Sequence, residues 1–265
     1  VYKRQAQVRR GYVLVTGPTG MGKSTTLATM LNEVNRQRKS KIVTVEDPIE
    51  FVFTHDRSII TQREIGTDTD SFPDALRAAL RQDPDVIMVG EMRDLETVDT
   101  SLKAAETGHL VFSTIHTADV ASTINRLVSF FPSEEHLQVR ARLADNLKAV
   151  VSLRLLVNKK QNGRVPAVEV MRSTRSIQEC IKDPARTHEI TEYIARGREE
   201  HMQTFDQHLL DLLRENKITM EAALNAASNP TDFQTRLEME GLIHDDDQVD
   251  TKPEAPFDIE TDERF

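Results

Sequence analysis

The sequence contains a single cysteine, Cys180, among its 265 residues. One thiol can form neither an internal disulfide framework nor a four-cysteine zinc site, so both ways of stapling a small domain are excluded. No apolar run approaches the roughly 20 residues that a membrane-spanning helix needs, and we therefore expect no membrane insertion. With 38% hydrophobic and 29% charged residues, the composition is typical of a soluble cytosolic protein.

The sequence also lacks a strong basic patch. Residues 244–265 contain nine acidic and two basic side chains, which account for seven of the nine net negative charges of the chain. The remainder is therefore nearly neutral, and it shows no basic stripe of the kind that nucleic-acid-binding proteins carry. This argues against a nucleic-acid translocase, and we expect no nucleic-acid partner.

Short apolar runs alternate with amphipathic patterns over most of the chain. The runs predict buried strands at residues 13–16, 42–45, 59–62, 86–89 and 110–114. The amphipathic patterns predict helices at residues 24–36, 72–81, 97–106, 120–128 and 134–147. Residues 150–156 fit either a strand or the last turn of the preceding helix. The alternation predicts an α/β fold with a doubly wound, mainly parallel sheet.

The end of the chain has a different pattern. Helices without intervening strands are predicted at residues 176–181, 188–196, 204–215 and 219–227. We therefore predict an α/β domain over residues 6–170, a small all-α domain over 171–242 and a disordered acidic tail over 243–265. A solubilising extension would suffice to explain this tail. Residues 1–5 resemble a translated sequencing adapter, and we expect the native sequence to begin near Ala6.

The first predicted strand leads into Gly17-Pro18-Thr19-Gly20-Met21-Gly22-Lys23-Ser24, which fits the pattern G-x-x-x-x-G-K-[ST]. Between a strand and a helix, the N–H groups of such a loop converge on phosphate oxygens. The lysine supplies a charge for the β- and γ-phosphates, and the serine hydroxyl is a ligand for Mg²⁺. The sequence thus predicts a site for ATP and Mg²⁺ formed by Gly17, Thr19, Gly20, Gly22, Lys23, Ser24 and Thr25.

Two carboxylate segments also follow predicted strands. Glu46-Asp47-Pro48-Ile49-Glu50 ends the strand at 42–45, which we expect to lie beside the nucleotide strand. A carboxylate there can orient the attacking water, although a solvated acidic turn fits the pattern equally well. The strand at 86–89 is followed by Glu91, a Walker B pattern in which the carboxylate holds Mg²⁺ directly or through water. Asp85 precedes this strand and should lie far from the phosphates.

Two histidines bracket the strand at residues 110–114. His116 follows the strand and should reach the active-site edge, whereas His109 precedes it and should lie at the opposite edge. A histidine near a γ-phosphate can report its presence. A purely structural role is the commoner one for a lone histidine, and both readings stay open at this point.

The chain resembles the secretion-ATPase superfamily through four motifs that occur in the superfamily's order. They are the glycine loop, the Glu-Asp-Pro-Ile-Glu box, the Val-Gly-Glu-Met-Arg-Asp segment and the Thr-Gly-His…His-Thr box. The resemblance covers about residues 10 to 242. The chain is most similar to the PilT family of pilus retraction ATPases, through residues 104–109 and 202–206 and the missing four-cysteine insert. The resemblance implies a RecA-like P-loop NTPase. It also implies that Glu50 is the general base, that Glu91 serves Mg²⁺ and water, and that His116 senses the γ-phosphate.

The resemblance further implies a homo-hexameric, ATP-hydrolysing motor that drives type IV pilus retraction and twitching motility. Its implied place is cytoplasmic and peripheral at the inner membrane, with an inner-membrane platform protein and other pilus ATPases as partners. The family's N-terminal PAS-like domain supplies arginines to a neighbouring site and is missing from this sequence, so we expect weak hydrolysis by this fragment. Glu46 and Asp47 are expected to brace the loop.

One motif departs from the family pattern. Retraction enzymes carry Ala-Ile-Arg-Asn-Leu-Ile-Arg-Glu, whereas the matching segment at residues 176–183 has Gln178 in place of the first arginine. The departure admits a PilU-like accessory retraction ATPase, and a pilus-assembly or type II secretion ATPase is a further alternative. A nucleotide-binding regulatory subunit without turnover is an alternative of a different class, which the intact Lys23, Glu50 and Glu91 argue against.

Overall fold

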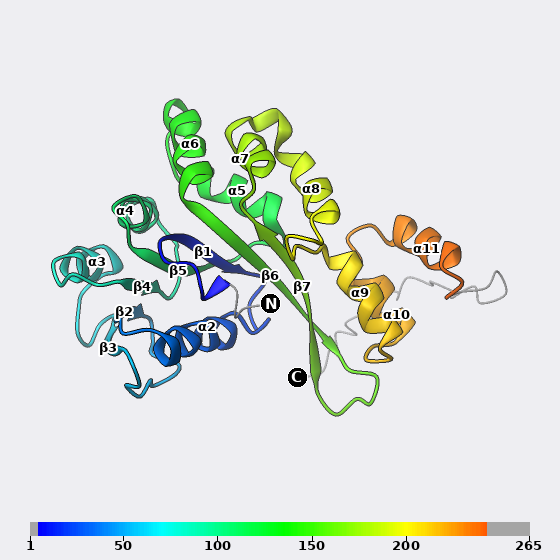
Figure 1. The fold of residues 1–265 in the computed structure, drawn as a ribbon, viewed down its shortest axis with the longest axis horizontal. Helices are drawn as coiled ribbons and strands as arrows, with labels where there is room; N and C mark the ends of the chain where they lie inside the picture. The colour runs from blue at the N-terminus through cyan, green and yellow to red at the C-terminus, as the bar shows by residue number, and fades with distance from the viewer. Residues whose placement is uncertain (1–4, 243–265) are drawn as a thin grey trace, which may run out of the picture.

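The computed structural model describes residues 5–242, and a seven-stranded sheet forms its centre (Figure 1). The strand order is β3-β2-β4-β5-β1-β6-β7. All neighbouring pairs are parallel except β6 and β7, which are antiparallel. The strands are β1 (Gly11–Thr16), β2 (Lys41–Glu46), β3 (Ile59–Glu64), β4 (Val86–Val89), β5 (Leu110–Ile115), β6 (Leu147–Val157) and β7 (Arg164–Arg172). The predicted α/β fold with a mainly parallel sheet is confirmed.

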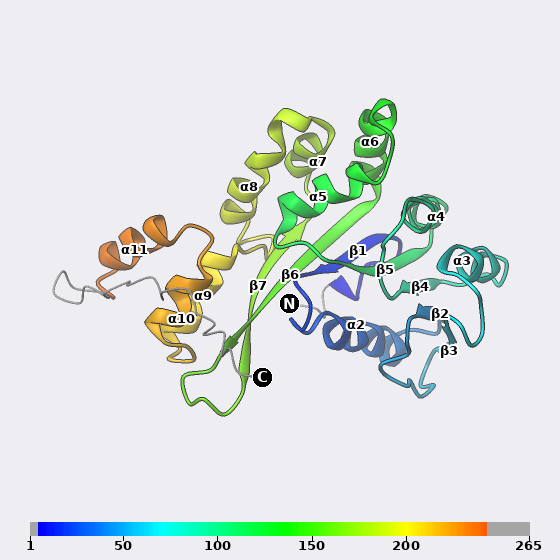
Figure 2. The ribbon, with the colours of Figure 1, turned by 180° about the vertical axis from the view of Figure 1, so that it is seen from behind.

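Helices cover both faces of this sheet, as Figures 1 and 2 show from opposite sides. On one face, α2 (Lys23–Gln37) packs its buried Leu27 and Leu31 against Val13 and Val15 of β1. Side chains alternate along a strand, so the neighbouring residues of β1 face the other way. The helices of that other face are α3 (Phe72–Leu80), α4 (Leu95–Glu106), α5 (Val120–Ser129) and α6 (His136–Asn146).

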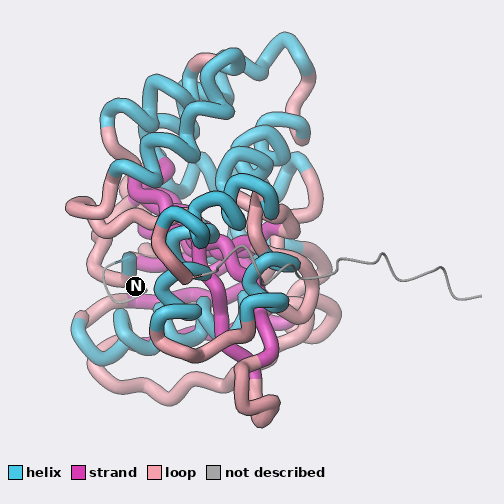
Figure 3. The backbone as a smooth tube through the Cα atoms, turned by 90° about the vertical axis from the view of Figure 1, so that its right-hand side faces the viewer, coloured by secondary structure: helices cyan, strands magenta, loops and turns pink. Residues whose placement is uncertain are grey.

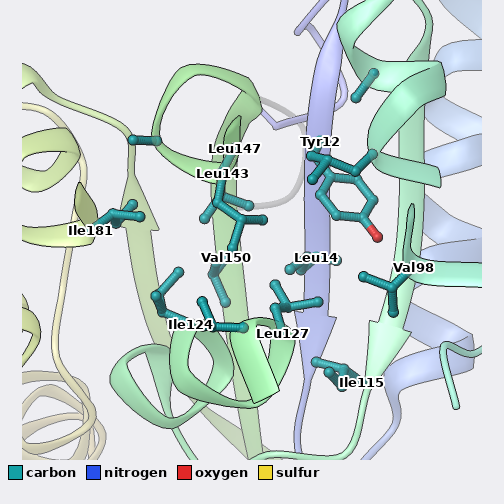
Figure 4. Close-up of a cluster of buried hydrophobic side chains, with 14 of the residues drawn as sticks. Tyr12, Leu14, Val98, Ile115, Ile124, Leu127, Leu143, Leu147, Val150 and Ile181 are labelled. Atoms are coloured by element: carbon teal, nitrogen blue, oxygen red, sulfur yellow. The ribbon is translucent and has the colours of Figure 1, made fainter. Parts of the chain in front are cut away.

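A large cluster of buried hydrophobic side chains fills the α5 face of the sheet (Figure 4). Leu14 of β1 and Val150 of β6 pack there with Ile124 and Leu127 of α5, and none of the four is exposed to solvent. Burying a side chain of this size stabilises the fold by about 1.5–3 kcal/mol. The middle of α5 is therefore packed against β1 and β6.

The helices after β7 belong to two hydrophobic clusters. Buried residues of α7 (Arg175–Lys182) and α8 (Ile190–Arg196) join the cluster on the α5 face of the sheet. Buried residues of α9 (Phe205–Arg214), α10 (Met220–Ala226) and α11 (Pro230–Met239) form their own cluster with Ala167 of β7. Figure 3 looks onto these last helices, with the β6–β7 hairpin reaching below them. The predicted domain boundary at residue 170 stays a prediction.

Two elements differ from the sequence-based expectation. Of the two readings left open for residues 150–156, the strand is the one observed, since these residues belong to β6 and α6 ends at Asn146. Strand β7 was not predicted, and its Pro166 is a residue that sheets tolerate mainly in edge strands such as this one. Helix α11 was not predicted either. Two short 3₁₀ helices, Ser133–Glu135 and Pro184–Glu189, complete the described chain.

Two predictions fall on the ends of the sequence. The acidic tail at residues 243–265 and the first four residues of the proposed adapter lie outside the described residues. Within residues 5–242, no helix combines the length and the apolar character needed to cross a membrane.

Candidate nucleotide-binding site

A pocket of about 500 Å³ lies where the parallel strands β1, β2, β4 and β5 end. The carboxyl ends of parallel strands meet at one edge of the sheet, which is where such folds bind ligands. Nine of the predicted site residues line this single pocket, although they come from four separate segments of the chain. They are Thr19, Gly20, Gly22, Lys23, Ser24, Thr25, Glu50, Glu91 and His116.

Gly17 is the one predicted residue that does not line the pocket. It has a φ of +144°, and a Cβ added there would lie 2.7 Å from the carbonyl oxygen of Leu153. This distance is too short for any side chain, so Gly17 serves the close approach of the loop to β6. Its part in the site is to shape the loop.

The glycine loop ends in an uncapped helix. Gly22 is the N-cap of α2, with a φ of 83° in the left-handed region, and no side chain caps this helix. In contrast, side chains of Ser71, Asp94 and Asp119 cap α3, α4 and α5. The first N–H groups of a helix have no partner within the helix, and they lie at the positive end of its dipole. The start of α2 is thus left free to receive phosphate oxygens.

Lys23 is held inside the site. Its Nζ donates a hydrogen bond to the carbonyl oxygen of Pro18 at 3.0 Å and lies 3.3 Å from Nδ1 of His116. The side chain is 8% exposed. Burial lowers the pKa of Lys23, although the charges of Glu91 and Glu50 oppose the shift. A cation with little bulk water around it interacts strongly with a phosphate, because the surrounding dielectric is low.

Glu91 and His116 form the opposite wall of the pocket. Nε2 of His116 lies 3.0 Å from Oε1 of Glu91, and Arg93 donates to Oε2 of Glu91 at 2.7 Å. Burial raises the pKa of Glu91, but Arg93 and His116 together hold it below its ordinary value. Lysine can only donate, so Nδ1 of His116 accepts from Lys23, and Nε2 faces the carboxylate of Glu91. His116 therefore connects Lys23 to an ionised Glu91.

Glu50 contacts the helix side of the pocket. The hydroxyl of Ser24 donates to Oε1 of Glu50 at 3.1 Å. Together with Glu91 this places a hydroxyl and two carboxylates around one pocket, and these oxygen ligands suit Mg²⁺. Within residues 5–242, no group of three or more His, Cys, Asp or Glu side chains could hold a metal by itself. The donor set therefore fits an ion that takes its other ligands from phosphate and water.

The prediction that β2 lies beside the nucleotide strand β1 was wrong. Strand β2, which ends at Glu46, pairs with β3 and β4, so β4 and β5 separate it from β1. The sequence does not encode strand order, and the later strands β5 and β6 take the places beside β1. Glu50 still reaches Ser24, because β2 ends at the same edge of the sheet.

The neighbours of Glu50 behave as braces, as expected. Glu46 accepts hydrogen bonds from Thr44 at 2.7 Å and from Gln62 at 3.1 Å. Asp47 lies 3.9 Å from Arg93, which also contacts Glu91. These contacts connect the loop after β2 to β3 and to the segment after β4.

The opposite edge of the sheet holds the residues that the sequence placed away from the site. Nδ1 of His109 contacts the carbonyl oxygen of Ala104 at 2.9 Å, and Asp85 accepts the N–H of Lys41 at 2.7 Å. Neither lines the pocket. The rule that residues after a parallel strand reach the site therefore placed His116 and Glu91 at the pocket. It also placed His109 and Asp85, which precede the same two strands, away from it.

Sequence reasoning missed two polar residues that line the pocket. Arg93 follows Glu91 by two residues in an extended segment, a spacing that places both side chains on one side. This spacing could have identified it. Thr114 is the last residue of the predicted strand and donates to the carbonyl oxygen of Gly90 at 2.7 Å, which connects the ends of β4 and β5. Nothing in its sequence context distinguishes it.

A glycine loop at the carboxyl edge of a mainly parallel sheet, faced by acids from two other strands, defines a P-loop nucleotide-binding protein. The chain matches the family of Type II/IV secretion system proteins over residues 1–233, and it belongs to this family.

Several relatives have known roles. The type IV pilus retraction ATPase PilT of Pseudomonas aeruginosa is 48% identical over 233 residues, which cover 88% of this chain and 67% of the relative. The twitching motility protein of Neisseria gonorrhoeae is 47% identical over 229 residues, covering 86% and 61%. PilU of P. aeruginosa is 41% identical over 239 residues, covering 90% and 62%. The chain thus spans about three fifths to two thirds of these relatives.

A solved structure has the same fold. The crystal structure of the pilus retraction motor PilT with bound ADP superposes with a TM-score of 0.82 at 45% identity. The match covers 88% of this chain and 66% of that one.

Proposed function

We propose that this chain is the ATP-hydrolysing part of a type IV pilus retraction motor. The observation that supports this most is the convergence of Lys23, Ser24, Glu50, Glu91 and His116 on one pocket. The relatives named for retraction and twitching motility, at 47–48% identity, support the biological role.

Each side chain has a part in the proposed reaction. Lys23 and the start of α2 bind the phosphates, and Ser24 and Glu91 hold Mg²⁺. When bound, Mg²⁺ supplies Lewis-acid stabilisation of the charge that develops on the phosphate oxygens. Glu50 orients the attacking water and accepts its proton.

His116 contacts the site at both ring nitrogens. Its contacts with Lys23 and Glu91 span the space between the glycine loop and the Walker B strand. A change at the phosphates that moves either partner must therefore also move the imidazole. We propose on this basis that His116 senses the γ-phosphate.

The proposed assembly rests on the similarity to the pilus retraction and twitching motility proteins. We propose a homo-hexamer that works against an inner-membrane platform protein from the cytoplasmic side, together with other pilus ATPases. A PilU-like accessory role is the second candidate, and Gln178 on α7 is the observation that favours it. This side chain is half-buried and lies 3.3 Å from Ser173, where the retraction motif has an arginine.

Nucleotide binding by the chain itself tests the proposal. Lys23→Ala should weaken the binding of a fluorescent ATP analogue with Mg²⁺ by about 10- to 100-fold, because a hydrogen bond from a charged group is lost. Lys39→Ala removes an exposed lysine away from the pocket and serves as the matched control. Equal affinity of the Lys23→Ala variant and the wild type would rule out the proposed site.

A further inference from the structure

A row of polar side chains crosses the sheet beside the start of the glycine loop. Thr16, the last residue of β1, pairs with Ser152 of β6, which in turn pairs with Glu169 of β7. Thr16 donates to the hydroxyl of Ser152 at 2.8 Å. All three side chains are buried, on the face of the sheet that α5 covers. Burying a polar group in an apolar core costs free energy unless it has a hydrogen-bond partner, so each of these side chains needs such a partner.

Glu169 holds the start of α5. Its Oε2 accepts the N–H of Val120, the first residue of this helix, at 2.9 Å. Asp119 caps the same helix through the N–H of Ser122 at 2.7 Å. Val120 follows His116 by only four residues. The segment 116–119 is therefore held between the end of β5 and a helix start that Glu169 fixes.

Arg154 continues the arrangement toward the C-terminal helices. Its guanidinium donates to the carbonyl oxygen of Ala226, the last residue of α10, at 2.5 Å. It also lies 3.8 Å above the ring of Phe205, the first residue of α9. One side chain of β6 thus contacts both helices.

The charges around Glu169 come from three elements. Burial raises its pKa to about 7, and the charges of Asp119 at the start of α5 and Asp206 on α9 act in the same direction. The N–H of Val120 and the charge of Arg154 on β6 oppose the shift. Strongly perturbed groups that have specific charge partners occur more often at functional positions than elsewhere.

The geometry points to Glu169 as a positioning residue that ties the nucleotide site to helices α9 and α10. This inference rests on the proposed function, because it takes the segment after β5 as the part that responds to phosphate. A displacement of residues 116–119 moves Val120 and with it the carboxylate of Glu169. Arg154, which interacts electrostatically with this carboxylate, passes the displacement to α9 and α10.

Hydrogen exchange on the whole chain tests the inference. In the wild type, MgATP should slow exchange both at residues 17–25 and in the remote segments 204–214 and 219–228. Glu169→Ala removes the acceptor for Val120, and the remote slowing should fall by about 2- to 30-fold while residues 17–25 stay protected. Glu169→Gln keeps the acceptor oxygen for Val120 but lacks the charge that acts on Arg154, so the start of α5 should stay protected while the remote slowing falls as in Glu169→Ala.

Two further variants sharpen the test. Arg154→Met removes the contacts with α9 and α10, and it should reproduce the loss of remote slowing. It therefore replaces Glu169→Ala in the test if that variant does not fold. Arg140→Ala is the matched control, because Arg140 is also a buried cation outside the pocket, bonded to Ile181 and Thr187 and, in the middle of α5 and away from its start, to Asn125. This variant should keep the remote slowing.

Three outcomes would overturn the inference while leaving the nucleotide site in place. The first is a wild type that protects residues 17–25 but not the remote segments. The second is an equal loss in Glu169→Ala and Arg140→Ala, which would reveal only a general loosening. The third is remote slowing that persists in both Glu169→Ala and Arg154→Met. No protection of residues 17–25 in the wild type would contradict the nucleotide site itself, and the inference with it.

Discussion

The buried carboxyl group of Glu169 should make the stability of the protein depend on pH. Its pKa is raised from 4.5 to about 7 in the folded chain. The folded state therefore binds a proton more tightly than the unfolded state, so this group contributes stability that is fully present below pH 4.5. The contribution is lost as the pH rises through 7. A shift of this size corresponds to about 3 kcal/mol, since one pKa unit is about 1.36 kcal/mol.

The variant Glu169→Gln isolates this contribution. Glutamine has the same shape and an acceptor oxygen for Val120, but it carries no charge that burial could penalise. The free energy of unfolding of the variant should therefore rise relative to that of the wild type by up to about 3 kcal/mol between pH 4.5 and 8. Other titrating groups are common to both proteins and cancel in the difference.

Urea unfolding at several pH values measures this difference. The two curves should diverge between pH 5 and 7, with the variant gaining as the wild type ionises. A difference that stays constant over this range would show that Glu169 titrates at its ordinary pKa. The charge of Arg154 and the N–H of Val120 would then fully offset the effect of burial on the pKa.

Two further predictions concern the glycine loop and the general base. Gly17→Ala should destabilise the fold by about 1–3 kcal/mol in urea unfolding, because its backbone lies in the left-handed region and its Cβ would meet Leu153. Gly20→Ala is the control, since it has a positive φ but open space around it, and it should cost less. Glu50→Gln should slow phosphate release by about 100-fold or more while nucleotide affinity is kept. Release at the wild-type rate would exclude Glu50 as the base.

The parts of the site that the sequence predicted share one property. The glycine loop is contiguous, and its conformation follows from residue types at fixed spacing. Glu91 and His116 were placed at the site because each follows a strand, and parallel strands end at the same edge. The same rule places the acids of residues 46–50 there, but only the family resemblance singled out Glu50 among them.

The parts that were missed depend on strand order or on tertiary partners. The place of β2 away from β1 depends on which later strands pair with β1. Strand β7 was overlooked because Pro166 and the charged Arg164 and Arg172 hide its apolar alternation, which an edge strand tolerates. Helix α11 has only two buried residues, Phe233 and Leu237, and its amphipathic pattern is correspondingly weak.

Glu169 shows why a rule based on strand ends could not be complete. The residues level with the end of β1 are Ser152 and Glu169, and they fall inside the long strands β6 and β7 and not after them. An acid at that position looks like an exposed residue of an ordinary strand. Only the register, from Thr16 through Ser152 to Glu169, brings it to the active-site edge. In a mixed sheet, functional side chains of the antiparallel strand must therefore be sought at the register of the nucleotide strand.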